Sequence, residues 1–373
     1  MTDRYIPNDF SPLLTLGDTK TYLRDALEQI LKHCPPLESY SGVRLAGLWE
    51  GPTGIAYLFL HVSAALPDLK IDGHHAITWA KEYLRGSRGH LHLEKGNCGF
   101  HSEWLCFLAV RACTTKDPAH VREFLSDIPA IVGHDFPDEM LYGRAGTLYL
   151  LRMIRHWVPD SASLVEPAVA SVSEKIMSEG TDWTYHGSRY LGSVHGDIGI
   201  VTQLVRTTPA LAERLEPKLA QLLSMQWADG NWPAREGSSH ATLTQFCHGA
   251  PGFVISLLSI GRFFPSLQDR VKSAVQKGRE CIWKQGLLRK EPSLCHGVFS
   301  NALALPLGRQ REHFLAMATP ENIARMRSQD SSLFEPADFG MKYGITPSYR
   351  ASAAWSWLVH DQESPGIIAY NDV

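Results

Sequence analysis

The stretch Gly143-Arg-Ala-Gly-Thr-Leu-Tyr-Leu-Leu-Arg-Met-Ile154 joins a short glycine turn to a nearly continuous apolar run. A second run of this kind, residues 54–66, follows another such turn. A helix that is apolar on almost every side is buried, so the pattern predicts inner helices after these turns. Related turns begin about 44 to 53 residues apart, a period typical of repeat proteins. They lie at Gly51-Pro-Thr-Gly54, Gly99-Phe-His-Ser102, Gly143-Arg-Ala-Gly146, Gly196-Asp-Ile-Gly199, Gly249-Ala-Pro-Gly252 and Gly297-Val-Phe-Ser300, with a degraded copy expected between Gly340 and Ser348.

The segments between these turns have the pattern of amphipathic helices. One example carries its apolar face at Tyr22, Leu23, Ala26, Leu27, Ile30 and Leu31. Each repeat is therefore predicted to be an outer helix, a glycine turn and an inner helix. Roughly seven such pairs can stack as an open solenoid or close into a ring. An open solenoid needs polar capping repeats, whereas here chemically reactive residues recur at the same point of successive repeats, which favours an all-α closed barrel.

Two of the turns carry the same tripeptide, Cys247-His248-Gly249 and Cys295-His296-Gly297. Thiolate and imidazole ligands suit Zn²⁺, and three protein ligands leave a fourth position open for a substrate. The pattern predicts a catalytic zinc site with Cys247, Cys295 and His296 as ligands. The alternative is that these cysteines are inert and packed near helix starts, as free cysteines commonly are.

Composition limits the class of protein. The 373 residues are 44% hydrophobic and 20% charged with a formal net charge of −3, which is enough apolar material for one large domain, predicted here as residues 1–373. Basic residues are scattered, so a nucleic-acid partner is not expected. No stretch is long enough to predict a transmembrane segment, and Met1-Thr-Asp-Arg-Tyr-Ile-Pro7 lacks the apolar core of a signal peptide. Seven cysteines, an odd number, then favour reduced thiols and a cytoplasmic location.

The chain resembles the LanC-like proteins, eukaryotic relatives of bacterial lanthionine cyclases, over almost its whole length. Segments 246–252 and 286–297 are similar to the two zinc motifs of that family, and 139–146, 194–199, 230–233 and 4–8 resemble further family segments. The resemblance implies an α/α toroid of seven inner and seven outer helices, with zinc held by two cysteines and one histidine. It also implies a reaction in which a thiol, glutathione in eukaryotic members, adds to dehydroalanine or dehydrobutyrine.

The resemblance also implies roles for residues outside the metal site. Michael-type addition leaves a carbanion to be protonated, and His195 matches the active-site histidine of the family. Glu139 matches an acidic family position and could orient that histidine, although a solvated carboxylate near a helix start is the alternative. Glutathione carries two carboxylates, which cationic side chains capture, and Arg4, Lys290 and Arg325 match such positions.

Other functions remain open at this stage. Gln226-Trp-Ala-Asp-Gly-Asn-Trp232 resembles the Gln-and-Trp repeat of triterpene cyclases, another class of toroid enzyme acting on small metabolites, but it occurs once and no Asp-rich acid motif accompanies it. A non-catalytic adaptor that binds glutathione and zinc is a further alternative. The electrophile is expected to be a dehydroamino-acid-containing peptide, a protein or a small molecule.

Overall fold

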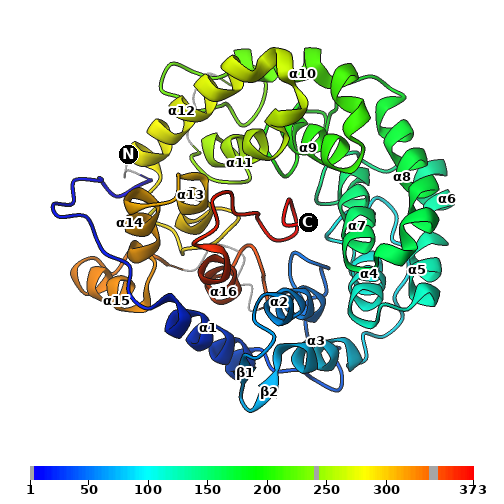
Figure 1. Cartoon of the computed structure of the whole chain (residues 1–373), viewed down its shortest axis with the longest axis horizontal. Helices are drawn as coiled ribbons and strands as arrows, with labels where there is room; N and C mark the ends of the chain where they lie inside the picture. The colour runs from blue at the N-terminus through cyan, green and yellow to red at the C-terminus, as the bar shows by residue number, and fades with distance from the viewer. Residues whose placement is uncertain (1–3, 239–242, 336–342) are drawn as a thin grey trace.

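The computed structural model describes residues 4–238, 243–335 and 343–373, and its regular structure is almost entirely helical. The helices form a closed double ring around a central axis (Figure 1). In the described residues, sheet structure is limited to one antiparallel hairpin on the outside, β1 (Lys70–Ile71) with β2 (His74–His75).

The inner ring, within the described residues, consists of seven helices. Each inner helix packs against the next, and the last packs against the first, so the ring is closed. These helices are α2 (Pro52–Ala65), α4 (Glu103–Thr115), α7 (Arg144–Trp157), α9 (Asp197–Thr207), α11 (Ala250–Ile260), α13 (Val298–Ala304) and α16 (Tyr349–Val359). Buried side chains face every direction on α2 and α7, as predicted from their uniformly apolar sequences.

The outer ring covers the inner one helix by helix. Its members in the described chain are α1 (Thr19–His33), α3 (Ala76–Arg85), α5 (Pro118–Leu125), α8 (Ala162–Met177), α10 (Ala212–Ser224), α12 (Gln268–Gln285) and α14 (Arg309–Met317). Two further helices, α6 (Ile128–Gly133) and α15 (Pro320–Gln329), lie against α8 and α14. The predicted toroid with seven inner and seven outer helices is therefore confirmed.

The two ends of the chain close the ring. The first outer helix, α1, packs on the last inner helix, α16, and buries Leu23, Leu27 and Ile30 there. Figure 1 shows α1 (blue) beside α16 (red) although more than 300 residues separate them in sequence. This pairing replaces the polar capping repeats that an open solenoid would need.

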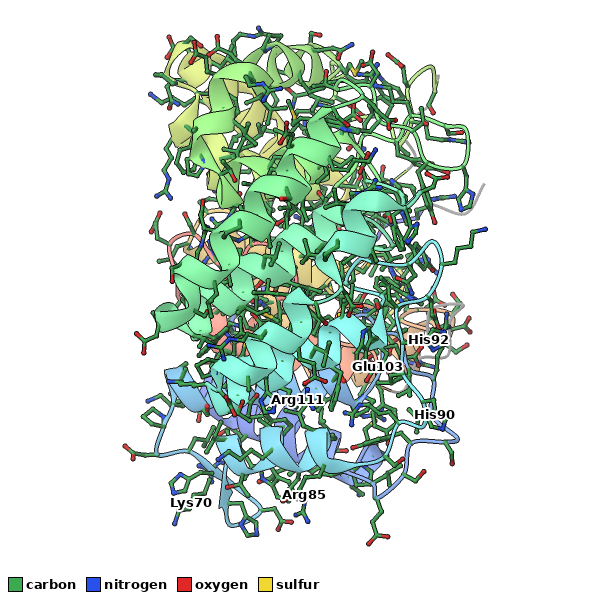
Figure 2. All side chains as sticks on the ribbon, turned by 90° about the vertical axis from the view of Figure 1, so that its right-hand side faces the viewer. Lys70, Arg85, His90, His92, Glu103 and Arg111 are labelled. Carbon is green, nitrogen blue, oxygen red and sulfur yellow. The ribbon has the colours of Figure 1, made fainter. Side chains whose placement is uncertain are left out.

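The inner helices begin at the predicted turns. The residues immediately before them are Gly51, Ser102, Gly143, Gly196, Gly249, Gly297 and Ser348. Gly340, part of the predicted seventh turn, lies outside the described residues. In the side view of Figure 2, Glu103 at the start of α4 lies toward the side that carries His90 and His92, whereas Lys70, which follows α2, lies at the opposite side.

The centre of the ring is filled by the last described segment, residues 364–373 (Figure 1). Arg152 donates hydrogen bonds to the carbonyl oxygens of Tyr370 and Val373, and Gln203 donates to that of Tyr370. Buried apolar side chains form one continuous cluster from Leu23 to Tyr370. Among the described helices, none combines the length and apolar character that crossing a membrane requires.

Candidate functional site

The turns before the inner helices are joined to one another by backbone hydrogen bonds. Each bond runs from a backbone N–H group of one turn to a carbonyl oxygen of a neighbouring turn. The donor and acceptor residues are Leu48 and Phe100 (2.8 Å), Phe100 and Met140 (3.3 Å), Met140 and Val194 (3.0 Å), Cys247 and Cys295 (3.1 Å), Cys295 and Thr346 (2.8 Å), and Ile345 and Trp49 (3.2 Å). All inner helices therefore direct their N-termini, the positive ends of their dipoles, to the same end of the ring.

Cys247 and Cys295 are brought together by this arrangement, because their turns are neighbours in the ring. On its other side, the Cys247 turn touches the fourth turn, where a Cβ at Gly192 would lie 2.1 Å from the Cys247 carbonyl oxygen. Only glycine permits that approach. Gly249, which precedes α11, has a φ of 110°, a conformation that glycine adopts readily.

The two thiols form a hydrogen-bonded pair whose pKa values are shifted in opposite directions. A hydrogen bond from Cys295 lowers the pKa of the Cys247 thiol, aided by Gln245, Lys290 and His195, against the opposing effect of burial. The same hydrogen bond, together with burial, raises the pKa of Cys295 well above its ordinary value. The two pKa shifts are therefore coupled and opposite in direction.

The pair suits a soft divalent metal as two of its ligands. Both sulfurs are buried, and His296 follows Cys295 directly and is also buried. Among the described residues, however, no group of three or more His, Cys, Asp and Glu side chains is already gathered around one point. Two of the three predicted ligands are thus in contact, whereas the part of His296 in metal binding stays a prediction.

His195 and Glu139 form the second element of the site. His195 Nδ1 lies 2.7 Å from Glu139 Oε2, and Glu139 is 2% exposed. The Glu139 carboxylate also accepts hydrogen bonds from the backbone N–H groups of Leu141 and Tyr142. Glu139 is therefore a buried carboxylate that fixes one imidazole nitrogen, and the alternative of a solvated surface carboxylate is excluded.

Aromatic rings that sequence reasoning did not single out surround His195. Tyr185 stacks on the His195 ring at 4.9 Å with an interplanar angle of 4°, and Tyr190 lies 6.0 Å from it. Burial raises the pKa of Tyr185 to about 12. The sequence signal near Tyr185 is the His186-Gly187 dipeptide, which predicts a turn. In the structure Tyr185 and Ser188 flank a tight two-residue turn in which His186 and Gly187 have positive φ.

His248, the histidine of the first Cys-His-Gly tripeptide, lies 6.4 Å from His195, ring centre to ring centre. Burial, together with the nearby positive charges of His195, Arg235 and Lys290, lowers the pKa of His248 to about 4. Its Nδ1 atom is buried and makes no hydrogen bond with any described residue. His248 is therefore a neutral ring beside the thiol pair.

The predicted glutathione contacts lie in different places. Lys290 Nζ donates to Gln245 Oε1 (3.1 Å), and Gln245 Nε2 lies 3.0 Å from Cys247 Sγ, so Lys290 is linked to the site through a residue that sequence reasoning missed. The Arg4 carbonyl accepts a hydrogen bond from Arg289 N–H, which places the Arg4 backbone beside the segment leading to Lys290. Arg325 is exposed on α15, outside the ring.

The segment that resembles a triterpene-cyclase repeat has a structural role. Gln226 Nε2 donates to the carbonyl oxygens of Gly230 and Ala274, which ties the segment to α12. Trp232 is buried and stacks on Phe253 of α11 at 4.4 Å. These contacts account for the motif without a catalytic function.

The fold and the site together define a class of protein, the α/α toroids that carry reactive groups on turns at one end of the ring. A family model described as "Lanthionine synthetase C-like protein" matches residues 46–311. The chain belongs to this family.

Two curated relatives resemble the chain over part of its length. A zebrafish (Danio rerio) protein named glutathione S-transferase LANCL1 is 28% identical over 186 residues, which are 44% of this chain and 45% of that protein. An Arabidopsis thaliana protein named LanC-like protein GCL1 is 30% identical over 181 residues, 44% of this chain and 41% of that protein. The aligned region thus spans less than half the length of either relative.

Proposed function

We propose that this protein is a zinc-dependent transferase that adds the thiol of glutathione to dehydroalanine or dehydrobutyrine by Michael-type addition. The family supports thioether chemistry, and the name of the zebrafish relative supports glutathione as the thiol. The observation that carries the proposal is the position of the Glu139–His195 couple beside the hydrogen-bonded pair of thiols, Cys247 and Cys295. The His195 ring lies 6.4 Å from the ring of His248, which follows Cys247 directly, and Gly192 approaches the Cys247 backbone, so the two elements lie close enough to act on one substrate.

Cys247, Cys295 and His296 would hold the metal. When bound, Zn²⁺ supplies the Lewis acidity that keeps a coordinating substrate thiol deprotonated at neutral pH. Gln245 orients the Cys247 sulfur with a hydrogen bond, and Lys290 in turn positions Gln245. Contacts of this kind fix ligand geometry and raise metal affinity.

His195 completes the addition by delivering a proton. The substrate sulfur forms a bond to the β-carbon, and the electron pair of the carbon–carbon double bond moves to the α-carbon and its carbonyl group. Glu139 occupies His195 Nδ1, so Nε2 is the nitrogen that gives its proton to the α-carbon. The proton that the thiol lost restores the imidazolium, and the net change is addition of S–H across the double bond.

Arg4 and Lys290 are proposed to bind the carboxylates of glutathione, and the pairing of residues 4–6 with residues 287–289 supports this by bringing their two segments together. Arg325 is the weakest member of that set because α15 carries it on the outside of the ring. We also propose that residues 1–373 form one domain, which the continuous hydrophobic core supports. A cytoplasmic location is a further proposal, based on the sequence alone.

The proposal is tested by turnover. Zinc-loaded protein is incubated with glutathione and an N-acetylated, C-amidated peptide that contains dehydroalanine, and the adduct is measured by mass spectrometry. A mass increase equal to one glutathione supports the transferase. Bound zinc and bound glutathione without any adduct would instead support the adaptor, which binds both without catalysing their reaction.

A further inference from the structure

A strip of half-exposed aromatic rings crosses the site end of the molecule. The aromatic strip consists of His101, Tyr142, Tyr185, His195, His248 and Tyr190, which come from four different turns or loops of the ring. One end of the strip is a single row, with ring centres 4.7 Å (His101–Tyr142) and 6.3 Å (Tyr142–Tyr185) apart. The other end is a cluster in which the His195 ring lies 4.9 Å from Tyr185, 6.4 Å from His248 and 6.0 Å from Tyr190, and Tyr190 lies 6.4 Å from Tyr185 and 5.9 Å from His248. The catalytic candidate His195 belongs to this cluster.

Each end of the aromatic strip carries an exposed arginine. The guanidinium of Arg235 lies 5.8 Å from the centre of the Tyr190 ring, and within the described residues Arg235 makes no ion pair. Arg44, which is 55% exposed, precedes the first turn, where Leu48 N–H donates to the carbonyl oxygen of Phe100, the residue before His101. Its charge adds to the effect of burial in lowering the pKa of His101, and its own partner is Glu50 at 3.6 Å. Glu139 beside the strip is engaged by His195, and Glu236 pairs with Arg189.

Imidazole nitrogens near the two ends have no partner in the described chain. Both nitrogens of His101 and Nδ1 of His248 are buried without a hydrogen bond. Buried polar groups are normally satisfied, so such atoms at a half-exposed surface suit a ligand that brings donors and acceptors. Peptide N–H and C=O groups are donors and acceptors of this kind.

We propose that the aromatic strip is the docking surface for an extended peptide that flanks the unsaturated residue, and that it selects aromatic and acidic neighbours. Alternate side chains of an extended chain are roughly 6.6 Å apart, close to the larger ring steps of the strip. Tyrosine is enriched at recognition surfaces because its ring is large and loses little conformational freedom on binding. The arginine at each end is complementary to Asp, Glu or phosphorylated side chains.

This inference rests on the proposed function, because His195 is taken as the catalytic residue of the strip. It adds where the peptide around the unsaturated residue binds and which neighbouring side chains are preferred. A single dehydroamino acid would contact His195 but could not reach both arginines. Contacts with both arginines would therefore come from the residues that flank the unsaturated one.

The test measures binding without turnover. The probe is an N-acetylated, C-amidated heptapeptide, Asp-Gly-Phe-Ala-Phe-Gly-Asp, in which Ala replaces the unsaturated residue, and its affinity is measured by calorimetry beside N-acetyl-alanine methylamide. We expect the heptapeptide to bind at least ~10-fold tighter than the single-residue probe, and replacement of its two Asp by Asn to weaken binding. Equal affinity of the two probes would overturn the proposal, and this comparison needs no variant protein.

Variants then locate the binding surface. Tyr142→Ala and Tyr185→Ala should each weaken heptapeptide binding by about 3- to 10-fold, the effect of one lost aromatic contact. Phe263→Ala is the matched control, because Phe263 is a partly buried ring that follows α11, away from the turns that precede the inner helices. Arg44→Gln with Arg235→Gln should abolish the preference for Asp over Asn. Unchanged binding in all three tests would contradict the proposal.

The two proposals fail differently. If the heptapeptide binds as described but its dehydroalanine form gives no glutathione adduct, the docking surface stands and the transferase does not. If a single dehydroalanine is turned over and the heptapeptide binds no better than that residue, the transferase stands and the docking surface does not.

Discussion

The site end and the centre of the ring differ in the hydrogen-bond partners of their buried titratable side chains. In the centre, the buried carboxylate of Asp372 accepts hydrogen bonds from Tyr57 (2.7 Å) and Tyr149 (3.0 Å) and lies 2.9 Å from His61 Nε2. Burial raises its pKa, but these partners outweigh burial and lower it. At the site end, His101 and His248 retain buried nitrogens without partners in the described chain. In the centre, Gln203 Oε1 and Arg206 Nε are also buried without a partner in the described chain, so the contrast is between the fully partnered Asp372 carboxylate and the unpartnered imidazole nitrogens. We assign a structural role to the first and, as proposed above, a substrate-binding role to the second.

The largest effect is expected from His195→Ala at the site end, which should reduce turnover without reducing stability. Loss of a general acid lowers turnover by about 10²- to 10⁴-fold. Zinc content should change little, because His195 belongs to no predicted ligand set. The melting temperature should also change little, because His195 is part-exposed and the buried Glu139 carboxylate keeps its hydrogen bonds from the backbone N–H groups of Leu141 and Tyr142. Activity with glutathione and a dehydroalanine peptide is measured against His120→Ala on α5. Turnover within threefold of the parent protein would remove His195 from the mechanism.

The reverse result is expected from Asp372→Ala in the centre of the ring. Removing one member of a buried charged network costs about 3–5 kcal/mol of unfolding free energy, because the remaining partners stay buried. Chemical denaturation measures this against Asp25→Ala, an exposed position on α1. A loss below about 1 kcal/mol would show that the central network is not structural.

Gly192→Ala tests how closely the turns are packed where they meet. The added methyl group would collide with the Cys247 carbonyl oxygen, and overpacking of this kind costs about 1–3 kcal/mol. The displaced Cys247 should also bind zinc less tightly. Gly133→Ala, with open space around the added carbon, is the control. Equal stability and zinc affinity for the two variants would contradict the close approach.

The smallest effect is expected in the pH dependence of stability, through His101 at the site end. Burial, with help from Arg44, lowers the pKa of His101 from 6.5 to about 4. Between these values the unfolded chain binds the proton and the folded chain does not, so stability falls as the pH falls from 6.5 to 4. For a half-exposed ring we expect about 1–2 kcal/mol, after allowance for solvent screening. His101→Phe should flatten this part of the stability curve, and an unchanged curve would contradict the assignment.

Local signals made the inner ring predictable from sequence. A glycine turn followed by an apolar run specifies where α7 begins and that α7 is buried, and both properties depend on neighbouring residues. Cys247 and Cys295 occupy the same point of successive repeats, so ring closure alone predicts that they meet.

Long-range contacts were beyond sequence reasoning. Nothing near Asp372 in the sequence announces Tyr57, which lies 315 residues away. Glu139 was open to two interpretations because its burial depends on how the 139–142 turn packs against the next one. Gln245 was missed because its link between Cys247 and Lys290 exists only after folding.

The central claim is that two cysteines from neighbouring turns form one metal-binding pair. Zinc per chain, measured by mass spectrometry of the purified protein, tests it in Cys247→Ser and Cys295→Ser, with Cys281→Ser as the control because Cys281 is a buried thiol on α12. We predict near-stoichiometric zinc in the parent protein and in the Cys281 variant, and loss of most zinc in the other two. Zinc retained in both Cys247→Ser and Cys295→Ser, or absent from the parent protein, would contradict the account.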